Sequence, residues 1–449
     1  MKVAEINKLG KELELYTSVD YVGKGFPIIM PRGSKIIKTI RNYIEWVEEN
    51  NGYRNVRTPS ISNSEIYKIA DRYSEEKSSY FIIKNENINT DNNESNQNEI
   101  VLKPNVQPFH CSIYKLEQHS YKDLPVKYCE TSTIFRNERD IKGIMRTRQI
   151  TLSDASIFCD FQNVKKEIKN CVILQQDIIK KLGLELKYVV SNWNDNEKEK
   201  YIGQINEWNT CFNAMQEVLD ELGIKYETDE KARMYGPAIK MYFDGFEFSV
   251  LQIDFEMPHR FDLKFKNEKN EDKTPIYIHN TIIGSYENLL SVLIDRYNGF
   301  FPLVIAPVQV CIIDDGEIYN DYSNEVLQAL REKGIRAEID KKNTSFQEKF
   351  QKNLQLRVPY IVKIGKQELN SNTITVAKVL GLLHENQGDA TEETDVDGVT
   401  NIETKENIKI EGRKTEKEEI EEKSNIKFEE KTYKINIFIE EVLNCQTKF

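Results

Sequence analysis

Apolar residues recur with helical spacing in three long segments of the first 230 residues. In residues 35–49 one face of a helix would collect Ile36, Ile37, Ile40, Tyr43, Ile44 and Val47. Residues 164–181 and 206–222 show the same periodicity. Each segment is long enough for several turns, so we predict three amphipathic helices that bury one face against a shared core.

Short apolar runs between and after these helices predict strands. They occur at residues 127–129, 148–152, 241–243, 246–254 and 275–279. Long helices inserted between strands of antiparallel type indicate an α+β fold and not regular βαβ winding.

The pattern changes after Phe301, where strands and helices alternate. Strands are predicted at residues 307–315, 335–340 and 359–365, and helices at residues 319–333 and about 345–354. Such alternation over about ninety residues is typical of a small α/β domain with a largely parallel sheet. The boundary between the two domains is expected near residues 303–307.

Two polar stretches interrupt these domains because they lack the apolar residues needed to bury a face. Residues 85–99 are rich in Asn and acidic groups, and the flanking runs 78–84 and 100–104 are strand-like, which predicts an enlarged hairpin loop. The second stretch holds fifteen acidic and eight basic residues between positions 389 and 431. We therefore predict a first domain over 1–303, with a polar insertion at 85–99. A second domain covers 304–383 and 432–449, around an acidic insertion at 384–431, and ends in a helix over 431–443.

Composition and charge narrow the class of protein. The sequence has no apolar run long enough to cross a bilayer and no signal-peptide core near Met1, so we expect a cytoplasmic protein without a membrane partner. Seven irregularly spaced cysteines favour reduced thiols. The net charge of −11 argues only weakly against an RNA partner, because the acidic insertion carries much of it.

Residues 131–159 hold the most informative chemistry. A strand that delivers Arg136 and Glu138 would place both on one face, since side chains in a strand alternate. Arg146 returns on the next strand. Two guanidinium groups and a carboxylate on one sheet face suit a phosphate anion and the amino group of a base. For an isolated pair of this kind, a surface ladder of ion pairs would be the simpler interpretation.

This segment resembles motif 2 of class II aminoacyl-tRNA synthetases in its threonyl form. Further segments resemble the same catalytic domain in the same order, namely residues 9–16, 25–44, 120–138, 235–240, 251–263, 278–290 and 300–310. Residues 341–343, 357–362 and 373–376 resemble the threonyl-type anticodon-binding domain. By this resemblance we expect the chain to lack the amino-terminal editing region of typical threonyl enzymes.

The resemblance implies adenylation of an amino acid by ATP with Mg²⁺, followed by transfer to the 3′ end of tRNA. It implies that Arg136 holds the substrate carboxylate and the α-phosphate, Glu138 reads the adenine amino group and Arg146 grips the outer phosphates. Asn343 would contact the anticodon. Residues 25–44 resemble motif 1, which implies a homodimer.

Several positions depart from the threonyl pattern. The family's catalytic zinc is held by one Cys and two His, which fall here on Gln107, Ser156 and His279. A single imidazole cannot hold zinc, so we expect no zinc and no other protein-held metal. The alternative, a shift of the loop that brings in His110 and Cys111, would break the register of a loop bounded by strands.

Without zinc, recognition of a substrate hydroxyl would depend on Asp154, Gln252 and His279, while Tyr235 fits the family's substrate-binding tyrosine. Leu152 and Phe248 would make this pocket smaller and less polar. The adenine clamp, by which we mean the family's side chains that enclose the adenine base, also differs at three positions. Asn288 replaces an arginine of motif 3, Ile150 replaces an aromatic residue and Ala238 replaces a lysine. An equally good interpretation is that three of these side chains are hydrogen-bonded polar groups of the protein core and bind no substrate, namely Asp154, Gln252 and His279.

Three functions remain open at this point. The first is a threonine–tRNA ligase or close relative, acting on threonine or a similar amino acid. The second is a divergent paralogue that activates another amino acid for an acceptor other than tRNA. The third is a catalytically inactive module that binds tRNA or regulates another protein.

Overall fold

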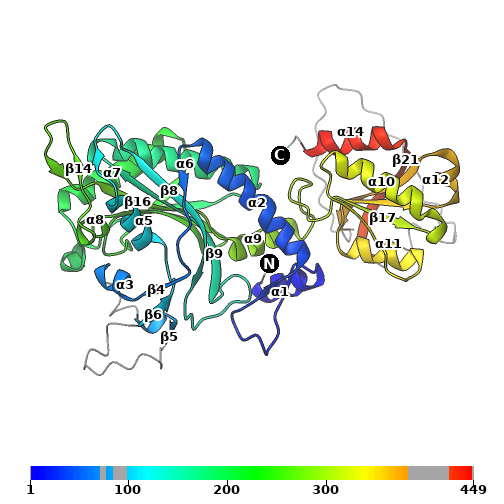
Figure 1. Ribbon diagram of the computed structural model, residues 1–449, viewed down its shortest axis with the longest axis horizontal. Coiled ribbons are helices and arrows are strands. Elements are labelled where there is room, and N and C mark those ends of the chain that lie inside the picture. The colour runs from blue at the N-terminus through cyan, green and yellow to red at the C-terminus, as the bar shows by residue number, and fades with distance from the viewer. Residues whose placement is uncertain (1, 71–76, 84–98, 383–423, 447–449) are drawn as a thin grey trace, which may run out of the picture. The chain divides into compact units, whose positions relative to one another are not determined.

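The computed structural model describes residues 2–70, 77–83, 99–382 and 424–446. The chain divides into two compact units, residues 1–299 and 300–449. Both are shown as ribbons in Figure 1. The predicted polar insertion at 85–99 lies almost wholly outside the described residues, as does most of the predicted acidic insertion.

An eight-stranded sheet forms the centre of the first unit, with strand order β11-β10-β12-β13-β16-β9-β8-β3. The inner strands from β10 to β8 pair antiparallel, whereas the edge strands β11 and β3 pair parallel with their neighbours. The strands are β3 (Arg54–Asn55), β8 (Val126–Phe135), β9 (Gln149–Cys159), β10 (Lys187–Ser191), β11 (Tyr226–Asp229), β12 (Ala238–Phe243), β13 (Phe246–Asp254) and β16 (Ile276–Ser285). This antiparallel-dominated sheet with flanking helices confirms the predicted α+β class.

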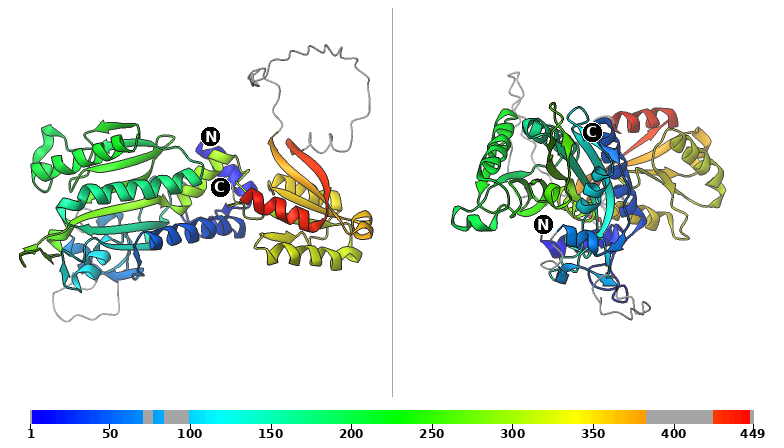
Figure 2. Two further views of the ribbon diagram at one scale, coloured as in Figure 1. Left: turned by 90° about the horizontal axis from the view of Figure 1, so that it is seen from above. Right: turned by 60° about the vertical axis from the view of Figure 1, so that its left-hand side comes forward.

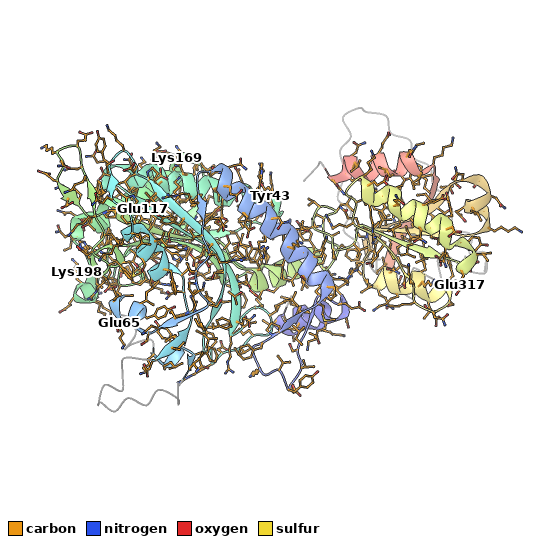
Figure 3. The ribbon with its side chains drawn as sticks, viewed as in Figure 1. Tyr43, Glu65, Glu117, Lys169, Lys198 and Glu317 are labelled. Atoms are coloured by element: carbon orange, nitrogen blue, oxygen red, sulfur yellow. The ribbon has the colours of Figure 1, made fainter. Side chains whose placement is uncertain are left out.

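The three predicted helices form at the expected places. They are α2 (Pro31–Asn50), α6 (Val164–Lys181) and α7 (Ile205–Glu221). Helices α6 and α7 lie side by side along the same face of the sheet (Figures 1 and 2). Ion pairs join the outer surfaces of the two helices, for example between Lys169 of α6 and Glu221 of α7. Lys169 is labelled in Figure 3. The other helices of this unit are α1 (Val3–Glu12), α3 (Glu65–Ile69), α5 (Gln107–Lys115), α8 (Met257–Arg260) and α9 (Tyr286–Tyr297).

The motif 2 segment differs from the sequence prediction in one respect. Strand β8 ends at Phe135, so Arg136 and Glu138 follow the strand and do not lie within it. Backbone pairing nevertheless continues for one residue, because the N–H of Arg136 donates to the carbonyl of Arg148 at 2.8 Å. The alternation that we used to place Arg136 and Glu138 on one face therefore does not apply to them.

Three small sheets complete the first unit. The strand-like runs that flank the polar insertion do pair, as β5 (Ile82–Ile83) with β6 (Ile100–Leu102), and β4 (Ile61–Asn63) adds to β6. The second small sheet pairs β1 (Tyr16–Thr17) with β2 (Ile28–Ile29). The third joins β7 (His119–Ser120), β14 (Phe265–Lys266) and β15 (Asp272–Lys273).

The second unit is a five-stranded sheet of order β18-β17-β19-β20-β21. Its strands are β17 (Val310–Asp314), β18 (Ala337–Ile339), β19 (Tyr360–Ile364), β20 (Ile374–Leu382) and β21 (Ile426–Tyr433). Strands β17, β18 and β19 are parallel as predicted, whereas β20 and β21 pair antiparallel, so the sheet is mixed. Its helices are α10 (Asn320–Glu332), α11 (Phe346–Gln355), α12 (Lys366–Ser371) and α14 (Ile435–Gln446). Apolar clusters cover both faces of the sheet.

Strand β21 corrects the predicted end of the acidic insertion. We placed residues 426–431 in the insertion and residues 431–433 in the final helix, but all of them belong to this strand. Ile426 and Phe428 are buried among charged neighbours, so one face of β21 packs on the core although the local composition is polar. The final helix begins only at Ile435.

Candidate active site

A cavity of about 750 Å³ opens on the sheet of the first unit. It is lined by the turn after β8, by strands β9, β13 and β16, and by the first turn of α9. Six of the seven residues that the sequence placed in the catalytic site line it, namely Arg136, Glu138, Arg146, Asp154, Tyr235 and His279.

Strand alternation decides which side chains of β16 can reach this cavity. Asn280 accepts a hydrogen bond from the amide of Gln175 on α6 at 2.7 Å, so Asn280 points to the helical layer. His279, one residue earlier, therefore points to the opposite face. Asp154 of β9 shares that face, because it pairs with Thr281, two residues beyond His279. The sheet thus separates a helix-covered face from the face that carries the cavity.

The motif 2 residues form a charged wall of the cavity. The guanidinium of Arg146 donates to one carboxylate oxygen of Glu138 through Nη2 at 2.8 Å and through Nε at 3.1 Å. The Nε of Arg136 donates to the carbonyl of Pro104 at 3.2 Å, and Arg148 supports the turn by donating to the carbonyl of Glu138 at 3.0 Å. Both Arg136 and Arg146 line the cavity, so they can neutralise one polyphosphate anion there.

Gln107, His279 and Asp154 form a compact polar cluster on the cavity floor. The Nε2 atom of His279 lies 2.6 Å from Nε2 of Gln107 and 2.5 Å from Oδ1 of Asp154. One imidazole nitrogen carries either a proton or a lone pair, so in a given tautomer it forms only one of these hydrogen bonds. The direct contacts leave no space for an ion between these three side chains.

Ser156, at the first His position of the family's zinc set, belongs to a buried polar network on the same face of the sheet as the cavity. Its hydroxyl contacts Nδ1 of His110 at 2.7 Å and the hydroxyl of Tyr277 at 2.9 Å. Glu130 accepts hydrogen bonds from the N–H of Thr58 at 3.0 Å and from its hydroxyl at 2.8 Å. The buried ammonium of Lys103 lies 3.2 Å from Glu130.

The network also sets the charge of Glu130. Burial raises the pKa of this carboxyl, but hydrogen bonds from His110 and Thr58 and the charge of Lys103 outweigh burial and bring the pKa to about 2. Glu130 is therefore ionised at neutral pH. Ser156 contributes to this buried scaffold and not to the cavity.

Gln252 is the predicted substrate-binding residue that the structure does not bring to the cavity. Its amide donates to the carbonyls of Gly236, Pro237 and Ile253 at 2.6, 3.2 and 2.9 Å. These bonds fix the side chain in the protein interior, where it supports the turn before β12. The interpretation as core polarity fits Gln252 better than substrate binding.

Two of the three substituted positions of the predicted adenine clamp, Asn288 and Ile150, line the cavity, whereas Ala238 is buried in β12. The substituted positions of the predicted substrate pocket, Leu152 and Phe248, also line the cavity. The amide oxygen of Asn288 accepts a hydrogen bond from the hydroxyl of Ser291 at 3.2 Å. The Asn288 side chain therefore turns along its own helix and contributes no positive charge to the cavity.

Sequence reasoning missed two cations that line the cavity, Arg233 and Lys142. Arg233 donates to the hydroxyl of Tyr235 at 3.1 Å, and the ammonium of Lys142 lies 5.7 Å from the ring centre of Phe246. The only signal in the sequence was proximity, since Arg233 stands two residues before Tyr235 and Lys142 lies between Arg136 and Arg146.

Asn343, the predicted anticodon contact, lies in the second unit. It is exposed in the turn between β18 and α11, beside the exposed Lys341 and Lys342. Among the described residues, no three His, Cys, Asp or Glu side chains gather closely enough to hold a metal ion. In the same part of the chain no helix is both long enough and apolar enough to span a membrane.

Two family descriptions match the chain. The tRNA synthetase class II core domain (G, H, P, S and T) matches residues 87–297, and the anticodon binding domain matches residues 307–401. The two matches follow the order of the structural units.

The curated relatives include threonine–tRNA ligases. Those of Clostridium botulinum and Clostridium perfringens are 37% identical over 385 residues, and that of Geobacillus kaustophilus is 33% identical over 387 residues. The aligned part is 84% of this chain and 58–59% of each relative, so the chain spans less than two thirds of their length.

Solved structures share the fold. The chain resembles the RNA binding domain of threonyl-tRNA synthetase from Cryptosporidium parvum with a TM-score of 0.73 and 24% identity, over 83% of this chain and 92% of that one. A putative threonyl-tRNA synthetase from Aeropyrum pernix gives a TM-score of 0.70 and 21% identity, over 83% and 88% of the two chains. With a class II core that carries the cavity and an anticodon-binding unit after it, the chain belongs to the class II aminoacyl-tRNA synthetases.

Proposed function

We propose that the chain activates an amino acid with ATP and transfers it to tRNA, as a threonine–tRNA ligase-like enzyme. One observation carries the proposal: Arg136, Arg146 and Glu138 line the same cavity as the Asp154–His279 pair. The guanidinium groups of Arg136 and Arg146 suit a triphosphate, and the buried carboxylate of Asp154 suits an amino acid bound in the same cavity. The curated relatives at 33–37% identity, all named threonine–tRNA ligases, support the same reaction class.

Each side chain has a role in the proposed reaction. A carboxylate oxygen of the amino acid attacks the α-phosphorus of ATP, the bond to the bridging oxygen breaks and pyrophosphate leaves. Arg136 neutralises charge at the α-phosphate and the attacking carboxylate, and Arg146 holds the outer phosphates. A hydroxyl of the tRNA 3′ end then attacks the aminoacyl carbonyl and AMP leaves. Both steps depend on positioning and charge neutralisation and need no covalent intermediate on the protein.

Glu138 has two partners in turn under this proposal. It pairs with Arg146 in the present structure, and it would accept a hydrogen bond from the adenine amino group when ATP is bound. The ion pair keeps both side chains ordered on the cavity wall before ATP arrives. Because Arg146 is half-exposed, its rearrangement toward the phosphates would cost little.

Mg²⁺ is the expected cofactor, and zinc is not. Mg²⁺ binds mainly phosphate oxygens and waters, and the outer phosphates that Arg146 would hold supply such oxygens in the cavity. Gln107, Ser156 and His279 do not fit zinc, since Gln107 and His279 contact one another directly and Ser156 is bound to His110 and Tyr277. Elemental analysis of the purified protein is expected to find substoichiometric zinc.

The remaining partners follow from the second unit and from α2. The exposed turn with Asn343 would contact the tRNA anticodon. A homodimer would form through α2 and the edge strand β3. Trp46 on α2 is 59% exposed in the single chain, so its exposure to solvent should fall if this surface is covered in a dimer. We place the protein in the cytoplasm, with the translation machinery.

Amino-acid-dependent exchange between ATP and pyrophosphate tests the proposal directly. The full chain is assayed with each of the twenty amino acids, and exchange with threonine or a similar residue is expected. Arg136→Ala should abolish it, with a loss of at least about 100-fold for one transition-state cation. Arg296→Ala, which removes a guanidinium outside the cavity lining, is the matched control and should keep the activity. Absence of exchange with every amino acid would contradict the proposal.

The second candidate function is that of a paralogue which transfers the amino acid to an acceptor other than tRNA. Measuring tRNA binding and the reaction product distinguishes it from the ligase. Activation of an amino acid without detectable binding of any tRNA would favour it. An aminoacylated tRNA product, recovered by acid gel electrophoresis, would favour the ligase. The sequence relatives give no support to this alternative.

A further inference from the structure

We propose that Lys142, in the turn before Arg146, is a further ATP-binding residue whose ammonium group holds the outer phosphates together with Arg146. The inference rests on the proposed function and deepens it, because it assigns a phosphate-binding cation at a position that the resemblance to the synthetases does not mark. Three features carry it: the backbone of the turn, a carboxylate that the two cations share, and the position of Lys142 in the cavity.

A tight turn holds Lys142 next to Arg146. The N–H of Lys142 donates to the carbonyl of Arg146 at 3.1 Å, and the N–H of Met145 donates to the carbonyl of Lys142 at 3.1 Å. Gly143 permits this turn, because its φ of +59° lies in the left-handed region that favours glycine. The backbone therefore keeps Lys142 and Arg146 opposite each other, so a long anion that reaches one of them also comes close to the other.

The side chains of Lys142 and Arg146 share one carboxylate. Oδ2 of Asp140 lies 3.3 Å from Nζ of Lys142 and 3.8 Å from Nη1 of Arg146. Asp140 is largely exposed, so water screens these contacts and an anion of higher charge can replace the carboxylate. The triphosphate of ATP is such an anion, and its outer oxygens would take the place of Oδ2 between the two cations.

The motif 2 segment supplies most of the positive charge of the cavity. Among the described residues that line the cavity, four are lysine or arginine, namely Arg136, Lys142, Arg146 and Arg233. Arg233 lies in the loop before β12, where it donates to the hydroxyl of Tyr235 and stands 4.0 Å from Glu247. The other three belong to the motif 2 segment, so a polyphosphate in this cavity depends on that segment for its counter-charge.

Lys142 also lies near the end of α9, where this chain has no cation. The first turn of α9 carries Asn288 in place of an arginine. The ammonium of Lys142 is 5.7 Å from the ring centre of Phe246, and Phe246 lines a crevice of about 20 Å³ together with Met145 and with Ser291 of α9. Ser291 in turn donates to the side chain of Asn288. Lys142 thus brings a positive charge to the part of the cavity that Asn288 leaves without one.

Calorimetric titration of the full chain with ATP and with AMP tests this role without relying on catalysis. Lys142→Ala should weaken ATP binding about 10-fold, as expected for one charge-assisted contact, and leave AMP binding unchanged because AMP lacks the outer phosphates. Lys264→Ala is the matched control. Lys264 also contacts the aspartate two residues before it, Asp262, at 2.9 Å, but it lies outside the cavity lining, so its loss should change neither affinity.

Two further variants separate a contact with phosphate from a structural role of Lys142. Lys142→Arg keeps the charge and should bind ATP nearly as well as the wild-type chain. Asn288→Arg, introduced into the Lys142→Ala chain, should recover most of the lost affinity, because it returns a cation to the same part of the cavity from another element. A defect in the fold of the turn would not be repaired in this way. In the exchange assay, Lys142→Ala should raise the KM for ATP and leave the KM for the amino acid unchanged.

The outcomes distinguish this inference from the proposed function. Absence of pyrophosphate exchange contradicts only the proposed function if Lys142→Ala still weakens the binding of ATP and not that of AMP. The inference would be overturned by equal ATP affinity of Lys142→Ala and the wild-type chain, by an equal loss for AMP, or by no binding of ATP to the wild-type chain. Failure of both Lys142→Arg and Asn288→Arg to restore binding would also overturn it, as would a loss confined to tRNA binding, which would assign Lys142 to the phosphodiesters of the tRNA 3′ end.

Discussion

Glu48 shows how a single buried carboxyl can make stability depend on pH. It lies on α2 with 1% of its surface exposed, and its Oε1 accepts from the hydroxyl of Ser153 at 3.3 Å. Burial raises the pKa of Glu48 to about 8. The folded state therefore keeps a proton that the unfolded chain releases above a pH of about 4.5. The stabilisation is complete below that pH and is lost as the pH rises through about 8.

Glu48→Gln should remove this dependence, because the amide has no proton to lose. The Tm of the variant relative to the wild-type protein is expected to rise between pH 5 and pH 9, by an amount that corresponds to a few kcal/mol at about 1.4 kcal/mol per pKa unit. Thermal unfolding followed by circular dichroism across this range measures it. A Tm difference that stays constant with pH would contradict the assignment.

Glu130 is a buried carboxylate with the opposite behaviour. Its pKa of about 2 means that its stabilisation is present above a pH of about 4.5 and is lost as the pH falls toward 2. Glu130→Gln should lower the free energy of unfolding by about 3–5 kcal/mol, because Lys103 then remains buried without a counter-charge.

A surface pair provides the control for Glu130. Glu227 contacts Lys187 at 2.7 Å, yet both side chains are more than half-exposed. Glu227→Gln should cost at most about 1 kcal/mol, because water screens this pair. Urea denaturation of the two variants compares them, and similar losses would show that burial does not set the strength of these pairs.

Individual residues could be predicted from the sequence where a motif fixed their surroundings. Arg136, Glu138 and Arg146 come together because one short turn connects them. Gln252 was misplaced, because nothing in a one-dimensional pattern reveals that three nearby carbonyl groups capture its amide. Arg233 was missed for the related reason that its loop enters the cavity only through the three-dimensional path of the chain.

At the scale of elements, the packing of α2 depends on one glycine. A Cβ atom at Gly33 would lie 2.1 Å from the carbonyl oxygen of Leu15, which is backbone and cannot move aside cheaply. Helix propensity alone would make alanine about 1 kcal/mol more favourable at this position. The close contact should instead make alanine destabilising at this position, because α2 would have to move away from the segment that follows α1.

We therefore expect Gly33→Ala to lower the free energy of unfolding by about 1–3 kcal/mol, as overpacked substitutions do. Ser34→Ala, at an exposed position in the same turn, is the control and should change it by less than about 0.5 kcal/mol. Both are measured by chemical denaturation. Stabilisation by Gly33→Ala would show that the contact can relax.

Elements with a clear period were the easiest to predict. The bounds of α6 agree with the sequence prediction, because eighteen residues keep one apolar face. Strand β21 was missed, since its two buried residues stand among glutamates and lysines that resemble the adjoining acidic stretch. Its position depends on pairing with β20, a contact that local composition does not encode.

At the scale of the whole molecule, the acidic stretch should oppose RNA binding. Residues 384–423 contain fourteen acidic and six basic side chains, and phosphate contacts make affinity for RNA sensitive to charge and salt. Strands β20 and β21 pair up to Leu382 and Ile426, so a short Gly-Ser linker can replace these residues without parting the strands.

Deletion of residues 384–423 is therefore expected to tighten tRNA binding several-fold in 50 mM salt and much less in 200 mM salt, because salt screens the repulsion. Fluorescence anisotropy with labelled tRNA measures both conditions. Equal dissociation constants for the two proteins at low salt would show that the charge of this stretch does not act on the bound RNA.

Because the side chain of Trp46 is exposed, its fluorescence can report whether two chains associate. The chain has three tryptophans, and the other two, Trp193 and Trp208, stack on each other in the first unit with ring centres 5.8 Å apart. Iodide in solution should thus quench the emission of Trp46 more strongly than that of the stacked pair. If α2 becomes covered when two chains associate, the quenchable fraction will fall with protein concentration, and the dissociation constant of the dimer can be read without attaching a dye.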